Sequence, residues 1–192
     1  MEQIRISIRD LPFQRRGLRK DVIRTLYEEF KLSLNEGCVL IATDGSKTHC
    51  RTTVAGKDFT NRKSFSGDVD TYCSINTAEC IALILALRKF VTANKNYIIL
   101  TDSMSVLEGL KLSRNPSSGV IKLKNELLEA RTRCETIKLV WVPGHTGIAE
   151  NEKVDKMAKK AKKRTISYYI PEEDIVREEK NLHAELQERT TA

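Results

Sequence analysis

The chain is organised around the stretch Val39-Leu40-Ile41-Ala42-Thr43-Asp44-Gly45-Ser46-Lys47. Its first five residues are apolar or β-branched without alternation, which favours a strand buried on both faces in the middle of a sheet. Asp44 follows at once, and burying an unpaired carboxylate is costly. An Asp-Gly pair is also common in turns, so this one acid does not establish a site.

Two further acids stand at comparable places in the sequence. Glu79 opens the apolar helical run 78–90, and Asp102 directly follows the apolar strand 97–100. Three acids at the ends of elements can converge on one spot, where they repel one another and raise some of their pKa values. A purely structural protein has little reason to gather them, so the pattern favours a functional site.

The charge of the chain is concentrated in its middle. Residues 38–165 carry 22 basic and 13 acidic residues, whereas residues 166–192 carry 3 and 7, within a net charge of +7 for 192 residues. A basic globular part favours a polyanionic partner such as nucleic acid, although excess charge also aids solubility. The length suits one domain of about 130 residues with extensions.

The sequence predicts a soluble intracellular protein, cytoplasmic or nuclear, that does not associate with membranes. It contains no run of 18 apolar residues and no signal-peptide pattern at its N-terminus. Five scattered cysteines without a Cys-x-x-Cys pair indicate a reducing compartment rather than a disulfide framework or a zinc site.

Three parts are expected along the chain. Residues 1–37 form an N-terminal extension, with a loosely attached leader over 1–17 and an amphipathic helix over 18–34. Residues 38–164 form the core domain. Residues 165–192 form an acidic C-terminal extension with few apolar anchors, so we expect the core to fold without the residues beyond Ile170.

The core domain is predicted to be an α/β fold with a five-stranded mixed sheet flanked by helices. The first three strands form an antiparallel meander, and the last two pair in parallel through a helical crossover. Thr77 is expected to cap the helix that carries Glu79, which would place this acid in the first turn. The predicted elements are strands at 39–43, 50–57, 64–75, 97–101 and 137–142, and helices at 78–90, 103–112, 118–134 and 151–163.

Five short motifs together carry a family resemblance. They are Thr-Asp-Gly-Ser at 43–46, Thr-Ala-Glu at 77–79, Thr-Asp-Ser at 101–103, Pro-Gly-His-Thr-Gly at 143–147 and Glu-Asn-Glu-Lys-Val-Asp at 150–155. In this order and spacing they resemble the type 1 ribonuclease H family from about residue 38 to 163. The sequence of residues 137–155 is most similar to the ribonuclease H domains of non-LTR retrotransposons of the jockey and I type.

The resemblance implies a metal-dependent catalytic site. The family's four acidic metal ligands fall on Asp44, Glu79, Asp102 and Asp155, and its mobile-loop histidine falls on His145. The implied cofactor is a pair of Mg²⁺ ions, for which Mn²⁺ substitutes, because two such ions can stabilise the attacking and leaving oxygens of phosphodiester hydrolysis. Hard oxygen ligands suit magnesium. The implied role of His145 is proton transfer and help in product release.

Substrate contacts are expected on both sides of the acids. Gly45 and Ser46 on the first strand, with Ser74 and Asn76 before the Glu79 helix, fall where the family reads ribose hydroxyls, phosphates and base edges. The helix face with Lys122 and Lys124 is a candidate for holding the DNA strand by charge, although a solvated helix face explains these lysines equally well.

The function implied by the resemblance is an endoribonuclease that cuts the RNA strand of RNA–DNA hybrids and leaves 5′-phosphate ends. The implied setting is retrotransposon reverse transcription, with a reverse-transcriptase domain of the same polyprotein as a partner. The alternative is a non-catalytic nucleic-acid-binding or connector module of the same fold. Acids at all four positions favour the enzyme, and the sequence leaves the oligomeric state open.

Overall fold

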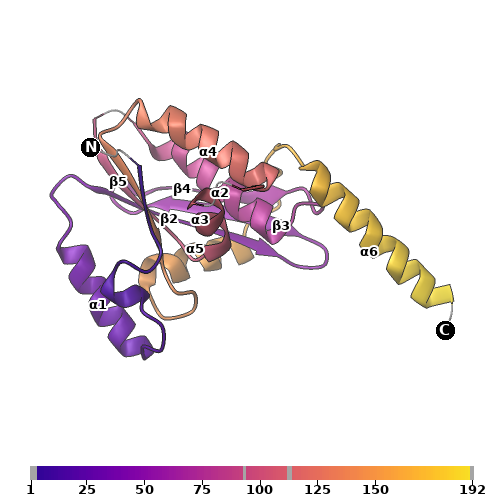
Figure 1. Cartoon of the computed structure of the whole chain (residues 1–192), viewed down its shortest axis with the longest axis horizontal. Coiled ribbons are helices and arrows are strands. Elements are labelled where there is room, and N and C mark those ends of the chain that lie inside the picture. The colour runs from indigo at the N-terminus through magenta and orange to yellow at the C-terminus, as the bar shows by residue number, and fades with distance from the viewer. Residues whose placement is uncertain (1–3, 93, 112–113, 191–192) are drawn as a thin grey trace.

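The computed structural model describes residues 4–92, 94–111 and 114–190, and it contains a mixed sheet with helices on both faces (Figure 1). Along the sheet the strand order is β1-β6-β5-β2-β3-β4. The strands are β1 (Ile4–Ser7), β2 (Val39–Lys47), β3 (Thr52–Asp58), β4 (Lys63–Val69), β5 (Asn96–Thr101) and β6 (Thr136–Trp141). The predicted five-stranded mixed sheet is confirmed, and β1 extends it to six strands.

Strand β2 lies inside the sheet, as its unbroken apolar run predicts. It pairs antiparallel with β3, with Thr43 opposite Gly56, and parallel with β5, with Ala42 opposite Leu100. Its first six residues are buried. Strand β4 ends at Val69, earlier than predicted, because the Asp70 backbone and carboxylate accept hydrogen bonds from the Cys73 and Tyr72 amides and form a turn.

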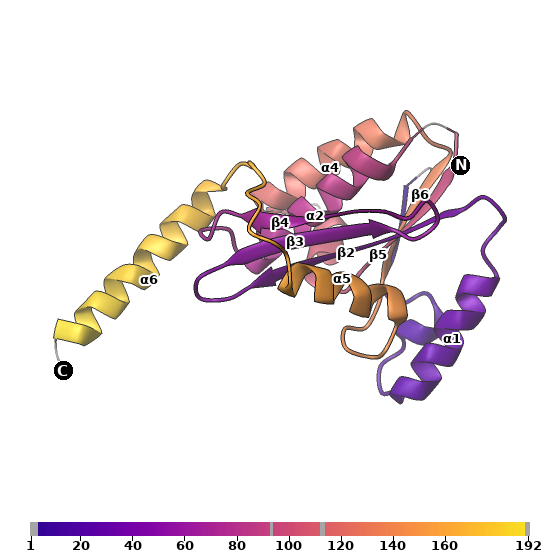
Figure 2. The same ribbon diagram turned by 180° about the vertical axis from the view of Figure 1, so that it is seen from behind.

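The helices form two layers. One short 3-10 helix, η1 (Pro12–Gln14), and six α-helices accompany the described strands: α1 (Lys20–Leu32), α2 (Ile75–Phe90), α3 (Met104–Lys111), α4 (Ser118–Arg131), α5 (Ala149–Lys159) and α6 (Glu172–Thr190). Figures 1 and 2 show α2 and α4 on one face of the sheet and α5 with α1 on the other. Helix α6 projects from the body.

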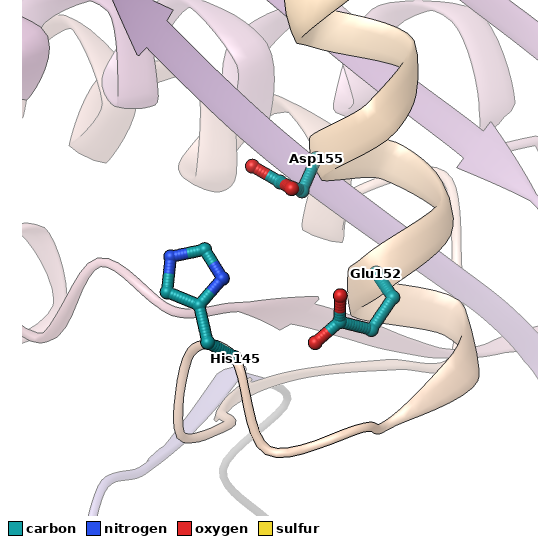
Figure 3. A group of neighbouring side chains, drawn as sticks. All are labelled: His145, Glu152 and Asp155. Carbon is teal, nitrogen blue, oxygen red and sulfur yellow. The ribbon is translucent and has the colours of Figure 1, made fainter.

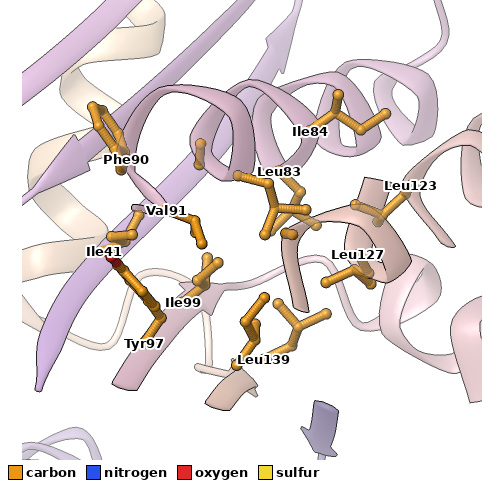
Figure 4. Close-up of a cluster of buried hydrophobic side chains, with 14 of the residues drawn as sticks. Ile41, Leu83, Ile84, Phe90, Val91, Tyr97, Ile99, Leu123, Leu127 and Leu139 are labelled. Carbon is orange, nitrogen blue, oxygen red and sulfur yellow. The ribbon is translucent and has the colours of Figure 1, made fainter. Parts of the chain in front are cut away.

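Helix α2 is the most buried helix, because its sequence is apolar nearly all round. Leu83 and Ile84 pack with Leu123 and Leu127 of α4 over the sheet, where Ile99 is fully buried (Figure 4). Each such side chain contributes about 1.5–3 kcal/mol when it is removed from water. Helix α2 is therefore a rigid support for the acid at its N-terminal part.

The start of α2 differs from the prediction. Ser74, not Thr77, is the N-cap residue, and its hydroxyl accepts a 3.0 Å hydrogen bond from the Thr77 amide. Thr77 uses its own hydroxyl to donate to Asp174. Glu79 consequently lies beyond the first turn, so its position depends on packing rather than on the helix dipole.

The predicted loose leader is wrong, because residues 4–14 belong to the domain. Strand β1 pairs in parallel with β6. The Gln14 side-chain amide donates to the carbonyls of Ser7 at 3.0 Å and Trp141 at 2.8 Å. Phe13 is fully buried against Tyr27 of α1, with ring centroids 5.5 Å apart in an edge-on contact. The amphipathic helix is confirmed as α1, which packs through this face.

The C-terminal extension also packs on the domain. The Asp68 amide of β4 donates to the Arg164 carbonyl at 2.8 Å, and the Asp68 carbonyl accepts from Ile166 at 2.6 Å. Gly67 permits this approach, since a Cβ there would lie 2.6 Å from the Arg164 oxygen. Further along the chain, Asp174 of α6 is buried against the N-terminus of α2, where its carboxylate accepts from the Ser74 amide. The segment beyond Ile170 therefore contacts the core, and the folding of the core without it stays a prediction.

Two sequence-wide expectations can be compared with the described residues. All five cysteines are free thiols, as their spacing predicts. In the described part of the chain, none of the helices combines the length and apolar character needed to cross a bilayer.

Candidate active site

Three of the predicted acids meet at one edge of the sheet. Strands β2 and β5 are neighbours and parallel, so Asp44 near the end of β2 and Asp102 just after β5 lie at the same edge. Helix α2 brings Glu79 to them. One carboxylate oxygen from each of these three residues lies within 4.8 Å of the others.

Gly45 is the residue that allows α2 to approach β2 so closely. A Cβ at this position would lie 3.0 Å from the Glu79 amide and 3.1 Å from the Ala78 side chain. A side chain here would require α2 to shift slightly away from β2. The Asp-Gly pair is therefore part of a strand, and its glycine serves helix packing rather than a turn.

The environment of the buried pair opposes ionisation. Asp44 is 4% exposed and Glu79 is 6% exposed. Burial, followed by the nearby charges of Asp102 and Asp155, raises the pKa of Asp44 to about 8. Burial and the charges of Asp44 and Asp102 raise the pKa of Glu79 well above its usual value, against a backbone hydrogen bond from Gly45.

The site fits a divalent cation on the chemistry of its donors. Asp44 Oδ2 and Glu79 Oε2 are buried oxygens without a hydrogen-bond partner among the described residues. Buried polar atoms are normally satisfied, so two orphaned carboxylate oxygens in one cluster indicate a missing ligand. A hard cation such as Mg²⁺ or Mn²⁺ binds oxygens of this kind and offsets their repulsion.

Asp155 lies in a second, adjoining cluster with His145 and Glu152 (Figure 3). One ligand atom from each of these three residues lies within 4.8 Å of the others. Lys159 holds the Asp155 carboxylate, with its Nζ 2.7 Å from Oδ1. The structure thus brings all four predicted acids to one region, but Asp155 belongs to a different cluster from the other three and is paired with Lys159.

Asn151 connects the two clusters. Its Nδ2 donates to Asp102 Oδ2 at 3.2 Å, and it is buried on the same helix as Glu152 and Asp155. The Trp141 indole donates to the Asp102 carbonyl at 3.1 Å, so this residue supports the acid in addition to packing on the core. The sequence motif contains Asn151 and Glu152, but their roles escaped prediction because only their helical spacing could have indicated them.

His145 is presented by a tight loop. Its backbone adopts φ 55°, and Gly147 adopts φ 86°, a conformation that favours glycine. The Thr146 hydroxyl closes the turn by donating to the Pro143 carbonyl at 2.7 Å. Figure 3 shows the imidazole on this loop, facing the helix that carries Asp155. His145 is exposed to solvent.

The predicted substrate-binding residues divide into two groups. Gly45 and Ser46 are half-buried beside Asp44 on β2, and Asn76 Oδ1 accepts from Ser105 at 3.3 Å near the acids. Ser74 is instead occupied: its hydroxyl caps α2 and its amide donates to Asp174 at 2.8 Å.

The basic face of α4 is only partly available. Lys122 places its Nζ 3.3 Å from the centroid of the Tyr169 ring, a cation–π contact with the C-terminal extension. Lys124 is exposed. Neither lysine is brought to the acids.

The layered sheet and its acidic edge define an α/β protein of the ribonuclease H-like fold. The ribonuclease H family model matches residues 36–163, and the chain belongs to this family. It is similar to the ribonuclease H of Neorickettsia sennetsu, with 33% identity over 113 residues that cover 53% of this chain and 74% of the relative. Family membership supports ribonuclease H activity on RNA–DNA hybrids and the general use of divalent metal ions.

Proposed function

We propose that this protein is an endoribonuclease that hydrolyses the RNA strand of RNA–DNA hybrids and leaves 5′-phosphate and 3′-hydroxyl ends. The observation that carries the proposal is the pair of orphaned, buried oxygens of Asp44 and Glu79 beside Asp102, in a chain of this family. A fold that only binds nucleic acid has no need of this destabilising arrangement.

Asp44, Glu79, Asp102 and Asp155 are the residues that would hold two divalent cations. Once bound, the cations would supply charge stabilisation at the attacking and leaving oxygens of the scissile phosphate. Asp44 and Glu79 are fixed by β2 and α2, and Asn151 orients Asp102. Asp155 also forms an ion pair with Lys159, which would compete with a cation for this carboxylate.

His145 is the proposed proton carrier. It is exposed on the loop 143–147, and it lies close to the carboxylates of Glu152 and Asp155. An imidazole can both give and take a proton near neutral pH. We propose that it protonates the leaving oxygen and that Glu152, on the same side of α5, orients the ring.

The competing proposal is a non-catalytic module of the same fold. The two proposals differ in one measurement, the cleavage of an end-labelled RNA–DNA hybrid with Mg²⁺ or Mn²⁺, set beside double-stranded RNA and DNA. We expect cuts in the RNA strand of the hybrid only, with products that carry 5′-phosphates. Binding of the hybrid without cleavage under any divalent cation would favour the module.

We further propose that the chain serves retrotransposon reverse transcription inside the cell, in the cytoplasm or nucleus, with a reverse-transcriptase domain of the same polyprotein as its partner. The resemblance of residues 137–155 to retrotransposon ribonuclease H domains supports this proposal. The test is whether the chain removes the RNA template during DNA synthesis by a retrotransposon reverse transcriptase that lacks its own nuclease activity.

A further inference from the structure

A basic groove lies between α5 and the outer strand β4, away from the acidic site. The residues that line it include five cations and no acid: Ser64, Phe65, Ser66, Lys153, Lys156, Met157, Lys160, Lys162 and Arg164. Like charges gathered along one groove repel one another, so this arrangement opposes folding slightly and calls for a partner of opposite charge.

The cations come from two consecutive segments. Lys153, Lys156 and Lys160 are spaced by three and four residues, which places them on one face of α5 and just beyond its end. Lys162 and Arg164 follow in the segment that crosses the edge of β4. None of the five forms an ion pair within the described part of the chain, whereas the neighbouring Lys159 is paired with Asp155.

The opposite wall is the outer edge of β4. Asp68 directs its amide and carbonyl outward to residues 164–166. In an antiparallel strand the outward groups recur at every second residue, so Ser66 and Ser64 direct their backbone amides outward as well. Their hydroxyls add further donors. Amides, hydroxyls and ammonium groups on facing walls are the groups that bind phosphate oxygens.

The groove lies within reach of the acids. Asp155 and Lys156 are adjacent on α5, so their side chains are about 100° apart around a helix about 10–12 Å in diameter. A nucleic-acid strand advances about 3.4 Å per nucleotide. A nucleic-acid strand that leaves the acidic site over α5 therefore reaches Lys153, Lys156 and Lys160 after about three or four nucleotides.

We propose that this groove binds the phosphate backbone of the nucleic acid that extends beyond the cleavage site. The inference rests on the proposed function for the identity of the substrate. It assigns the main electrostatic contact to α5 and β4 rather than to α4, where Lys122 is engaged by Tyr169. The groove increases affinity for long substrates and does not take part in the chemistry.

The test compares two triple variants of the full chain that each remove three positive charges. The groove variant is Lys153→Gln, Lys156→Gln and Lys160→Gln. The matched control is Lys124→Gln, Arg131→Gln and Arg133→Gln on the exposed face and C-terminal end of α4. Affinities are measured by fluorescence anisotropy in the Asp44→Asn background, on hybrids of about 6 and about 20 base pairs, since the shorter one, when centred on the acids, extends only about three nucleotides to either side.

We expect the groove variant to bind the long hybrid at least about tenfold more weakly, with a salt slope reduced by about 0.9 for each phosphate that is no longer neutralised. The short hybrid should bind both variants alike. Equal losses of affinity for the groove and control variants, or an equal loss on both hybrids, would overturn the proposal, provided that melting temperatures match that of the parent.

The outcome is separable from that of the proposed function. If the parent chain cleaves hybrids and the groove variant binds them normally, the groove proposal alone fails. If the parent chain cleaves nothing but the groove variant loses affinity for the long hybrid, the nuclease proposal fails and the groove remains a nucleic-acid site.

Discussion

Two regions of this molecule that contain buried carboxylates have opposite electrostatics. At the acidic edge of the sheet, burial and neighbouring acids raise the pKa of Asp44 to about 8. At the start of α2, burial also acts to raise the pKa of Asp174, but hydrogen bonds from Thr77 and Ser74 and the charge of Arg177 bring it below its usual value.

Both carboxylates are nearly inaccessible to solvent, with Asp44 4% and Asp174 2% exposed, but their neighbours differ. Asp174 Oδ2 accepts from the Ser74 amide and the Thr77 hydroxyl, and Oδ1 accepts from Arg177. Asp44 Oδ2 has no described partner, and the charges of Asp102 and Asp155 lie nearby. A buried carboxylate with its donors stabilises the fold. One without them lacks the donors or the cation that would offset its burial.

The largest effect is expected at the acidic edge. Asp44→Asn removes one metal ligand and should reduce hybrid cleavage on the order of 10³-fold or more. It should leave the melting temperature in the absence of metal unchanged or raised, because a repelled charge is gone. The control is Asp70→Asn, which changes an exposed carboxylate in the turn after β4. Normal turnover by Asp44→Asn would exclude the proposed metal site.

The pH dependence of stability should differ between the two regions. The raised pKa of Asp44 means that the native state binds the proton more tightly than the unfolded state, where the pKa is about 3.9. Without metal, this carboxyl should therefore reduce the free energy of unfolding as pH rises from about 4 to about 8. Asp174, with a lowered pKa, should add stability above about pH 4 that is lost in more acidic solution.

Chemical denaturation between about pH 3 and about pH 9 measures this difference. Saturating Mg²⁺ should restore stability at the alkaline end, because a ligand that binds only the native state stabilises it. In Asp44→Asn the alkaline decline should be smaller. A parent chain whose stability rises steadily from about pH 4 to about pH 8 without metal would contradict the raised pKa.

Asn151→Ala tests whether Asn151 orients Asp102 within the acidic site. The substitution removes the 3.2 Å hydrogen bond from Asn151 Nδ2 to Asp102 and leaves Asp102 less well oriented. Loss of a residue that orients a metal ligand typically costs about 10–100-fold in activity or metal affinity. We expect about this reduction in kcat, together with a higher Mg²⁺ concentration at half-maximal activity. Unchanged metal dependence would limit Asn151 to packing.

The smallest effect is expected at Asp174, whose carboxylate accepts hydrogen bonds from Ser74 and Thr77. Asp174→Asn should lower the free energy of unfolding by about 1–3 kcal/mol, because charge-assisted hydrogen bonds at the start of α2 are lost. Glu172→Gln, two residues earlier and exposed, is the control.

Truncation after Ile170 should destabilise the chain at least as much as Asp174→Asn. A truncated chain that melts like the parent would show that the contact does not form in solution.

The parts of the fold that could be predicted are those with a strong local pattern. The apolar run 39–43 predicted a buried strand, and the apolar stretch 78–90 predicted the most buried helix. Asp44 and Asp102 lie close together because β2 and β5 pair in parallel, and α2 brings Glu79 to them.

The parts that escaped prediction depend on long-range contacts. Strand β1 has only four residues and is held by β6 and by the Gln14 side chain, which is separated from Trp141 by 127 positions in the sequence. Ser74 and Thr77 are both good capping residues, and the choice between them is made by Asp174. No local pattern around 165–174 indicates that an acidic segment is anchored at the start of a distant helix.

The pairing of β1 with β6 also affects how the protein behaves at high concentration. Ile4 to Ser7 cover the side of β6 from Ile137 to Val140 that would otherwise end the sheet. An uncovered strand of this apolar kind is a template for pairing with other chains. The first strand thus replaces a six-residue apolar edge by a four-residue edge that carries Arg5, and short or charged edge strands pair less readily with other chains. A variant that weakens β1 is expected to remain folded in dilute solution yet to precipitate as its concentration rises.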